Sequence, residues 1–348
     1  MTKILVTGAS GYIGSHTVID LLEHGYEVIG IDNQVNSSLK SYDRIQEITG
    51  KKIIHYQADI CNKTELEKIF STHRDAKAVI HFAALKSVEE SIVKPFLYYQ
   101  NNMMGLINLL ELQNTYGVHN HIFSSSCTVY GNTHELPVTE STPWNTAESP
   151  YGLTKQLGEL TIENVTKVRP DFKAISLRYF NPAGAHPSAR LGEAAIVEVR
   201  NLIPLVMETG FGKRKELLVF GNDYPTRDGT NIRDYIHILD LAHAHTLALE
   251  HLLKNKVANS YNVYNVGSGN GSSILEVIHA FEKVTGKKLN YRITDKRPGD
   301  VVAIYADFSK ANKELGWAPK YTIEDIMHDA WEWEEEKAEY LMVKSSVI

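Results

Sequence analysis

Three side chains near the middle of the chain could together move a proton and a hydride. Tyr151 and Lys155 lie four residues apart in the run SPYGLTK, and Ser126 closes a serine run 25 residues before Tyr151. Residues four apart on a helix share one face, so both can act at one site. A phenol with a pKa of about 10 is a poor base at neutral pH, and a nearby ammonium favours its phenolate. Y-x-x-x-K alone also fits an ordinary surface helix.

A glycine loop near the N-terminus changes that balance. Gly8, Gly11 and Gly14 follow an apolar run and open an amphipathic stretch. Glycines at such a strand-to-helix turn let the backbone approach a pyrophosphate at the helix N-terminus. The alternative interpretation is a glycine-rich turn that binds no ligand, but such a turn does not require a strand before it and an amphipathic helix after it. Together with the Tyr, Lys and Ser, the loop predicts a nicotinamide cofactor beside an alcohol carbon.

Two acidic residues follow the next predicted strands. Asp32 comes 18 positions after Gly14, where a carboxylate binds the adenosine ribose hydroxyls and repels the extra phosphate of NADP. Asn33 and Gln34 follow, and neither is an arginine that would hold that phosphate. We therefore expect NAD. Asp59 could contact the adenine or could equally cap a turn or helix.

Composition narrows the class of protein. The chain has 348 residues, 43% apolar and 22% charged, which suits one large domain or two fused ones. Its formal charge of -6 argues against binding nucleic acid or an anionic membrane. Cys61 and Cys127 are expected to be free thiols, with Cys127 packing under the site. With no leader and no membrane-spanning apolar run predicted, we expect a cytoplasmic protein.

The N-terminal half alternates short β-type runs with helical stretches. The predicted strands are residues 4–7, 27–31, 52–57, 78–82, 119–125 and 173–177, and two of the predicted helices are 12–24 and 95–116. This alternation predicts an α/β fold, a doubly wound parallel sheet of Rossmann type. The glycine loop, Asp32, Asp59, residues 81–86 and Ser126 should meet at the carboxyl edge of the sheet. Residues 273–276 predict a capping box, and residues 331–337 a solvated helix.

Several runs resemble the extended short-chain dehydrogenase/reductase family, beginning with residues 7–16. Within that family the chain looks like the UDP-glucose 4-epimerases, over about residues 3–335. The runs that carry this likeness are residues 82–88, 124–131, 149–152, 178–185, 221–226 and 233–237. The resemblance implies a Rossmann domain at residues 1–180 that contains the Tyr/Lys helix. Residues 181–348 would mainly bind the nucleotide sugar in a smaller α/β part, with some chain returning to the sheet.

The resemblance also implies an activity and a set of contacts. Tightly held NAD would oxidise the sugar at C4, and the hydride would return to the opposite face of the 4-keto sugar, which interconverts UDP-glucose and UDP-galactose. Tyr151 would be the acid/base, Lys155 its activator and a ribose contact, and Ser126 the partner at the 4-oxygen. The implied cofactor contacts are these three residues, the three glycines, Tyr12, Ile13, Asp32, Asn33, Asn36, Ser37, Asp59, Ile60, Phe82, Ala83, Lys86, Asn101 and Phe180. The implied substrate contacts are Lys86, Ser126, Tyr151, Tyr179, Asn181, Asn201, Leu202, Arg233, Arg297, Asp300 and Ile304.

Some alternatives stay open at this point. Ile304 stands where the family often has tyrosine or cysteine that gates sugar size, so UDP-N-acetylhexosamines are alternative substrates. The related dehydratases need an Asp-Glu pair after the catalytic Ser/Thr, but Cys127 and Thr128 follow Ser126 here. An NAD-fold sensor without chemistry would lose the Tyr/Lys pair. The family also implies a homodimer through helices near residues 95–116 and 150–168. No metal is expected, since His243 and His245 are two apart and cannot share a helix face.

Overall fold

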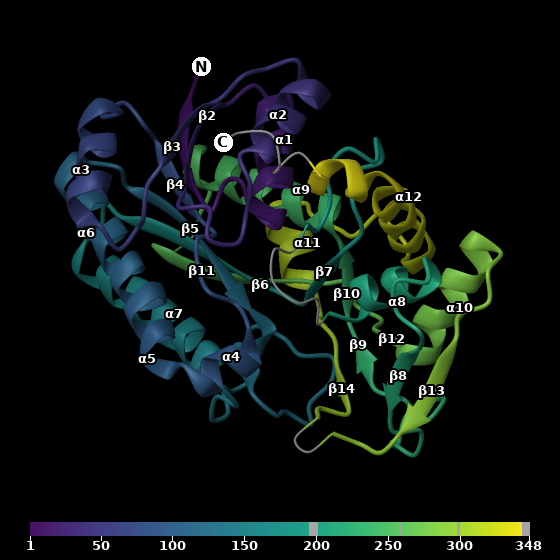
Figure 1. Cartoon of the computed structure of the whole chain (residues 1–348). Helices are drawn as coiled ribbons and strands as arrows, with labels where there is room; N and C mark the ends of the chain where they lie inside the picture. Colours follow the sequence, from purple (N-terminus) through teal and green to yellow (C-terminus); the bar gives the residue numbers. More distant parts are fainter. Residues whose placement is uncertain (195–200, 258, 298–299, 343–348) are drawn as a thin grey trace.

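The computed structural model describes residues 1–348 except 195–200, 258, 298–299 and 343–348. At its centre is a parallel sheet of seven strands in the order β11-β6-β5-β4-β1-β2-β3 (Figure 1). Its strands are β1 (Lys3–Thr7), β2 (Glu27–Asp32), β3 (Ile54–Gln57), β4 (Ala78–His81), β5 (Asn120–Ser126), β6 (Lys173–Tyr179) and β11 (Tyr261–Val266). The first six follow the doubly wound order 3-2-1-4-5-6, which confirms the predicted fold class.

Helices cover both faces of this sheet because its central strands are apolar on both sides. In β1, Ile4 and Val6 pack toward one cluster and Leu5 toward another, and all three are fully buried. The first face carries α1 (Tyr12–Glu23), α2 (Lys40–Thr49), α9 (Ile238–Leu253) and α11 (Ser309–Leu315). The other carries α3 (Lys63–Thr72), α4 (Val88–Val93), α5 (Pro95–Tyr98), the π-helix η1 (Tyr99–Met104), α6 (Gly105–Tyr116) and α7 (Pro150–Val168).

The C-terminal half builds a smaller part with its own apolar cluster. Its described residues form three short β-sheets: β7 (Asn181–Ala183) with β10 (Tyr235–His237), β9 (Ile232–Arg233) with β12 (Ser272–Ser273) and β14 (Ala303–Ile304), and β8 (Leu217–Phe220) with β13 (Tyr291–Thr294). Its helices are α8 (Leu202–Gly210), α10 (Ile274–Thr285) and α12 (Ile323–Met342). The predicted capping box of Ser273 and Glu276 opens α10 and is confirmed.

One expectation about the C-terminal helix was wrong. Trp331 and Trp333 of α12 are buried, with Trp331 stacked on Phe211, so residues 331–337 are not a solvated helix. The predicted helix at residues 95–116 is confirmed as α5, η1 and α6 in succession, and π segments such as η1 often mark functional sites. No helix in the described part of the chain is long and apolar enough to cross a membrane.

Candidate active site

The glycine loop forms a tight cradle between β1 and α1. Gly8 has φ +69°, and its N–H donates to the carbonyl of Ile31 at 2.8 Å. A Cβ on Gly14 would lie 2.1 Å from the carbonyl oxygen of Gly8, so only glycine fits there. Gly11 is the N-cap of α1 and has no side chain with which to cap it. The first backbone N–H groups of α1, at Tyr12 and Ile13, therefore suit an anionic ligand.

Asp32 joins this cradle to the loop that follows β2. Its carboxylate accepts hydrogen bonds from the N–H of Ser10 at 3.1 Å, the N–H of Gln34 at 2.8 Å and the hydroxyl of Ser37 at 2.8 Å. Asn36, in the same loop, is exposed. This arrangement places a fixed negative charge beside the glycine turn, where the ribose contact was predicted.

The ends of β3 and β4 complete the predicted cofactor edge. Asp59 accepts from the N–H of Cys61 at 2.7 Å and from Asn33 at 3.1 Å, so it does form the turn that was one of its two expected roles. The backbone of Ala83 passes so close that a Cβ on Gly8 would meet its nitrogen at 2.8 Å. The backbone of Phe82 also lies beside Gly8, and the side chain of Ile60 is buried. Asn101 donates a hydrogen bond to Asn102 within η1. Lys86 is largely exposed and pairs with Glu193 at 3.2 Å.

Tyr151 and Lys155 occupy the first turns of α7, beside the end of β5. Ser149 caps the helix by accepting the N–H of Gly152 at 3.1 Å, and Pro150 takes the first position, so the helix starts one residue before Tyr151. The ammonium of Lys155 donates to the carbonyl of Ser124 at 2.5 Å and lies 5.8 Å from the ring centre of Tyr151. The structure thus brings together the three side chains that the spacing predicted would act as a set.

Burial dominates the protonation of this group. It raises the pKa of Tyr151 well above its usual range, and hydrogen bonding to Ser126 opposes the rise only in part. Burial also lowers the pKa of Lys155 to about 8, opposed by the charge of Glu159. The net effect of the packed site is therefore to raise the pKa of Tyr151, and the lowering expected from Lys155 stays a prediction. The ammonium points at the Ser124 carbonyl, and desolvation of the phenolate outweighs its distant charge.

A buried ion pair under this group was missed from the sequence. Glu159, one turn after Lys155 on α7, binds Arg178 of β6 through Nη2 at 2.7 Å and Nε at 2.9 Å. Ser125 donates its hydroxyl to the same carboxylate, and Arg178 also donates to the hydroxyl of Tyr130 at 3.1 Å. The sequence shows that Glu159 lies four residues after Lys155. It does not show that Arg178, on another element, is the partner of Glu159.

The predicted substrate residues come from strands, helices and loops of both parts of the chain. Tyr179 donates its hydroxyl to Ser124, and the guanidinium of Arg297 lies 3.7 Å from the ring centre of Phe220. Arg233 pairs with Asp300 at 2.8 Å and not with its neighbour Asp234, which accepts the N–H of Ala306 instead. Asn181 donates its N–H to the Asp234 carbonyl at 2.9 Å, Asn201 is the N-cap of α8, and Leu202 is its first residue. Residues 298–299, between Arg297 and Asp300, lie outside the described residues.

Ile304 lies in register with Arg233, since β14 and β9 are paired. Its side chain is 8% exposed and packs in a cluster with Phe180 and Tyr130. Cys127 packs against the same cluster, as expected of a residue under the site. A larger residue at position 304 must therefore either repack this cluster or project toward Arg233.

Comparison with known proteins gives the family. Residues 5–330 match the family model described as GDP-mannose 4,6 dehydratase. The chain is 46% identical to the UDP-glucose 4-epimerase of Bacillus subtilis over 95% of this chain and 96% of that protein, and 47% identical to UDP-glucose 4-epimerase 2 of Arabidopsis thaliana over 95% and 94%. Among solved structures, the Bifidobacterium longum UDP-glucose 4-epimerase in complex with NAD⁺ and UDP has a TM-score of 0.91 at 44% identity, covering 96% of this chain and 98% of that one. Likeness over nearly the whole length of each relative leads to one conclusion: the chain belongs to the UDP-glucose 4-epimerase family.

Proposed function

We propose that this protein is an NAD-dependent enzyme that interconverts UDP-glucose and UDP-galactose by inverting C4 of the sugar. The observation that carries the proposal is the group of Tyr151, Lys155 and Ser126 at the same sheet edge as the glycine cradle, in which Lys155 and Ser126 are buried. The Bifidobacterium longum UDP-glucose 4-epimerase shares this fold over 96% of the chain.

The residues at the cradle fit NAD. The uncapped first turn of α1 would hold the pyrophosphate, and Asp32 would accept the ribose hydroxyls, which disfavours NADP. Lys155 would reach the nicotinamide ribose from α7. When bound, the nicotinamide would accept the hydride that leaves C4 of the sugar. Its positive charge would favour the phenolate form of Tyr151.

Tyr151 carries the proton in this mechanism. As C4 is oxidised, the phenolate oxygen takes the proton of the sugar 4-hydroxyl, and it returns that proton when the 4-keto sugar is reduced on its other face. Ser126 hydrogen-bonds the same oxygen and keeps it aligned with Tyr151. Because burial raises the pKa of Tyr151, the phenol stays protonated until a positive charge is close. Positioned proton transfer of this kind contributes roughly 10²–10⁴-fold to the rate.

The nucleotide-sugar site would use Arg233 and Arg297. A guanidinium forms forked hydrogen bonds with a diphosphate, which a single lysine cannot do. The guanidinium of Arg233 pairs with Asp300 and donates to the carbonyl of Val301 at 2.7 Å. Its side chain is therefore oriented before the substrate binds. Ile304 beside it would leave some room for a 2-substituent, and we expect weaker turnover of UDP-N-acetylhexosamines than of the simple hexoses.

Dehydration is the second candidate reaction, because the matching family model carries a dehydratase description. It needs a further acid and base next to the serine. Cys127 and Thr128 occupy those positions, and burial raises the pKa of the Cys127 thiol to about 12, so neither residue supplies an acid or base at neutral pH. Epimerisation requires no such pair.

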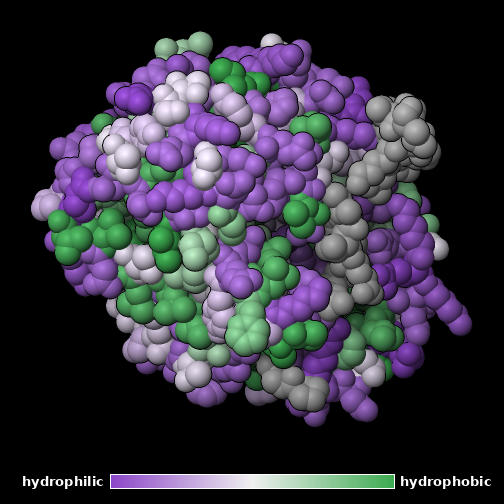
Figure 2. All heavy atoms as spheres, turned by 60° about the vertical axis from the view of Figure 1, so that its left-hand side comes forward, coloured by the Kyte–Doolittle hydropathy of each residue, from purple (hydrophilic) through white to green (hydrophobic). Residues whose placement is uncertain are grey.

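We also propose a homodimer through the helices on the second face of the sheet. Exposed apolar side chains gather there, in the lower part of the face shown in Figure 2. They are Val88, Ile92, Val93, Phe96, Leu97, Met104, Ile107 and Leu160, from α4, α5, η1, α6 and α7. A gathering of exposed apolar side chains on one face is typical of a surface that binds another protein chain. Light scattering should give twice the chain mass, and Phe96→Glu should give a monomer. The cytoplasmic location stays a prediction.

The decisive assay follows UDP-galactose by NMR with purified protein and no added cofactor. We expect conversion to UDP-glucose, carried by NAD that co-purifies. Tyr151→Phe should abolish turnover and keep NAD bound, whereas Tyr116→Phe, at the far end of α6, should behave as wild type. Near-normal kcat in Tyr151→Phe would disprove the assigned role, and accumulation of a dehydrated sugar would support the rival reaction.

A further inference from the structure

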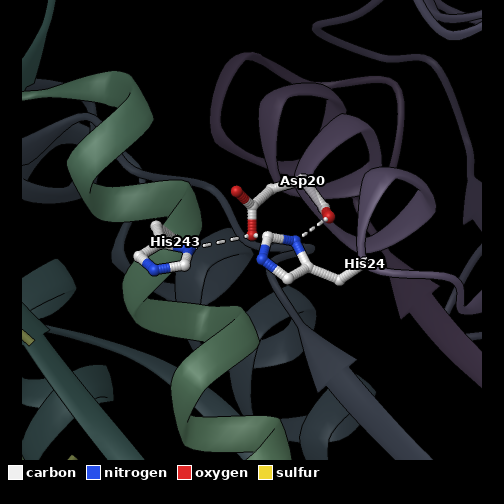
Figure 3. Close-up of side chains that lie close together, drawn as sticks. All are labelled: Asp20, His24 and His243. Atoms are coloured by element: carbon white, nitrogen blue, oxygen red, sulfur yellow. Dashed lines mark hydrogen bonds and ion pairs between the residues drawn. The ribbon is translucent and has the colours of Figure 1, made fainter. Parts of the chain in front are cut away.

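A group of metal-ligating side chains lies where α1 and α9 pack against each other. Asp20 and His24 come from the last turn and C-cap of α1, and His243 comes from α9 (Figure 3). One donor atom from each residue lies within 4.8 Å of the other two. His245, two residues on, is buried against Phe82 and Tyr179 and belongs to a different environment.

The spacing of these donors matches a small tetrahedral ion. Nδ1 of His243 lies 3.4 Å from Oδ2 of Asp20. Two ligand atoms bound tetrahedrally to Zn²⁺ at 2.0–2.1 Å are about 3.3–3.4 Å apart. This pair therefore has the required separation without any movement of the helices.

The third ligand is oriented by a hydrogen bond within α1. Nδ1 of His24 lies 2.7 Å from the backbone carbonyl of Asp20, so this nitrogen carries the proton and donates it. The lone pair of the ring is then on Nε2, which lies on the side of the ring that faces His243 in Figure 3. A hydrogen bond that sets the tautomer in this way is usual for histidines that bind metals.

Charge and access also suit a cation. The side chains of His24, His243 and Asp20 are 36%, 28% and 18% exposed, so an ion and a water can reach them. Two imidazoles, one carboxylate and one water form a typical zinc ligand set.

We propose that Asp20, His24 and His243 bind Zn²⁺, with water in the fourth position. His24 lies 12 residues beyond the start of α1, which is about 18 Å along the helix from the glycine cradle. The ion would join the end of α1 to α9 and stabilise the fold, and it would not take part in turnover.

The test uses the full-length protein after EDTA treatment and dialysis. Titration calorimetry with ZnCl₂ should show one equivalent bound, the melting temperature should rise with Zn²⁺, and Co²⁺ should give the visible spectrum of a tetrahedral ion. His243→Ala and Asp20→Asn should each weaken this binding by at least the roughly 10–100-fold known for the loss of outer-shell partners. His279→Ala, which removes an exposed histidine from α10, should bind as wild type.

Turnover and NAD content separate a lost site from a misfolded variant. Both should be unchanged in the two variants and in the EDTA-treated enzyme. Equal Zn²⁺ binding by wild type and both variants would overturn the proposal and leave the three residues as a hydrogen-bonded contact between helices. Loss of turnover after EDTA that Zn²⁺ restores would overturn the purely structural role.

Discussion

Among the described residues, Glu159 is the only one whose carboxylate contacts Arg178. Both side chains are almost completely buried. Replacing it by Gln keeps the shape and removes the charge. Arg178 would then be a buried cation without a counter-ion, which costs about 3–5 kcal/mol. For a chain of 348 residues the entropy of unfolding is about 0.7 kcal/mol/K, so Glu159→Gln should lower the melting temperature by about 4–7 °C.

The same substitution should alter the pH dependence of turnover. The charge of Glu159 acts to raise the pKa of Lys155, which burial lowers to about 8. Without that charge the pKa of Lys155 falls further, and Lys155 loses its proton at lower pH. Because the ammonium is needed beside Tyr151, the pH above which kcat declines should move to a lower value.

Calorimetry and a kcat profile from pH 6 to 10 measure the two effects. Glu163→Gln is the matched control, since Glu163 lies one turn further along α7 and pairs with Lys167 at the surface. It should change stability by less than about 0.5 kcal/mol. The double variant Glu159→Gln with Arg178→Met should be more stable than the sum of the single losses predicts. Additive losses, or a melting point within 1 °C of wild type in Glu159→Gln, would refute this account of the pair.

Three further predictions concern the cofactor and the sugar. Gly14→Ala should purify without NAD, because its Cβ would meet the backbone of Gly8 at 2.1 Å; cofactor released from the protein and quantified by chromatography checks this, and a full complement would contradict it. Wild-type protein should release NAD and not NADP, identified by mass, whereas Asp32→Ala should raise the NADP fraction; mainly NADP in wild type would remove Asp32 from its role. Ile304→Tyr should lower kcat/KM for UDP-N-acetylhexosamines relative to UDP-hexoses by an amount equivalent to roughly 1–3 kcal/mol, and an unmoved ratio would show that this position is not the gate.

The sequence was sufficient to predict six strands of the seven-stranded sheet and the candidate catalytic group. Apolar runs that alternate with helical stretches require parallel strands covered on both faces, and the observed strands begin and end within two residues of the predicted ones. Tyr151 and Lys155 were predictable as a pair because helical spacing is local. The role of Gly8 and Gly14 was predictable for the same reason, because the turn that they permit lies between neighbouring elements.

Contacts between distant segments were decided by the tertiary structure. His243 meets Asp20 because α9 packs beside α1, which lies far from it in the chain, and Arg178 meets Glu159 because β6 packs against α7, the element before it. Strand β11 joins the sheet edge beside β6 for the same reason. No local pattern encodes such partners, since the chain between them can take many lengths.

Protonation was also outside the reach of the sequence. Spacing alone predicted that Lys155 would lower the pKa of Tyr151, whereas the packed site raises it. A pKa depends on how completely water is excluded and on where each charge points, and both are set by the whole fold. The sequence therefore determined which groups share the site, and the tertiary structure determined their charges and partners.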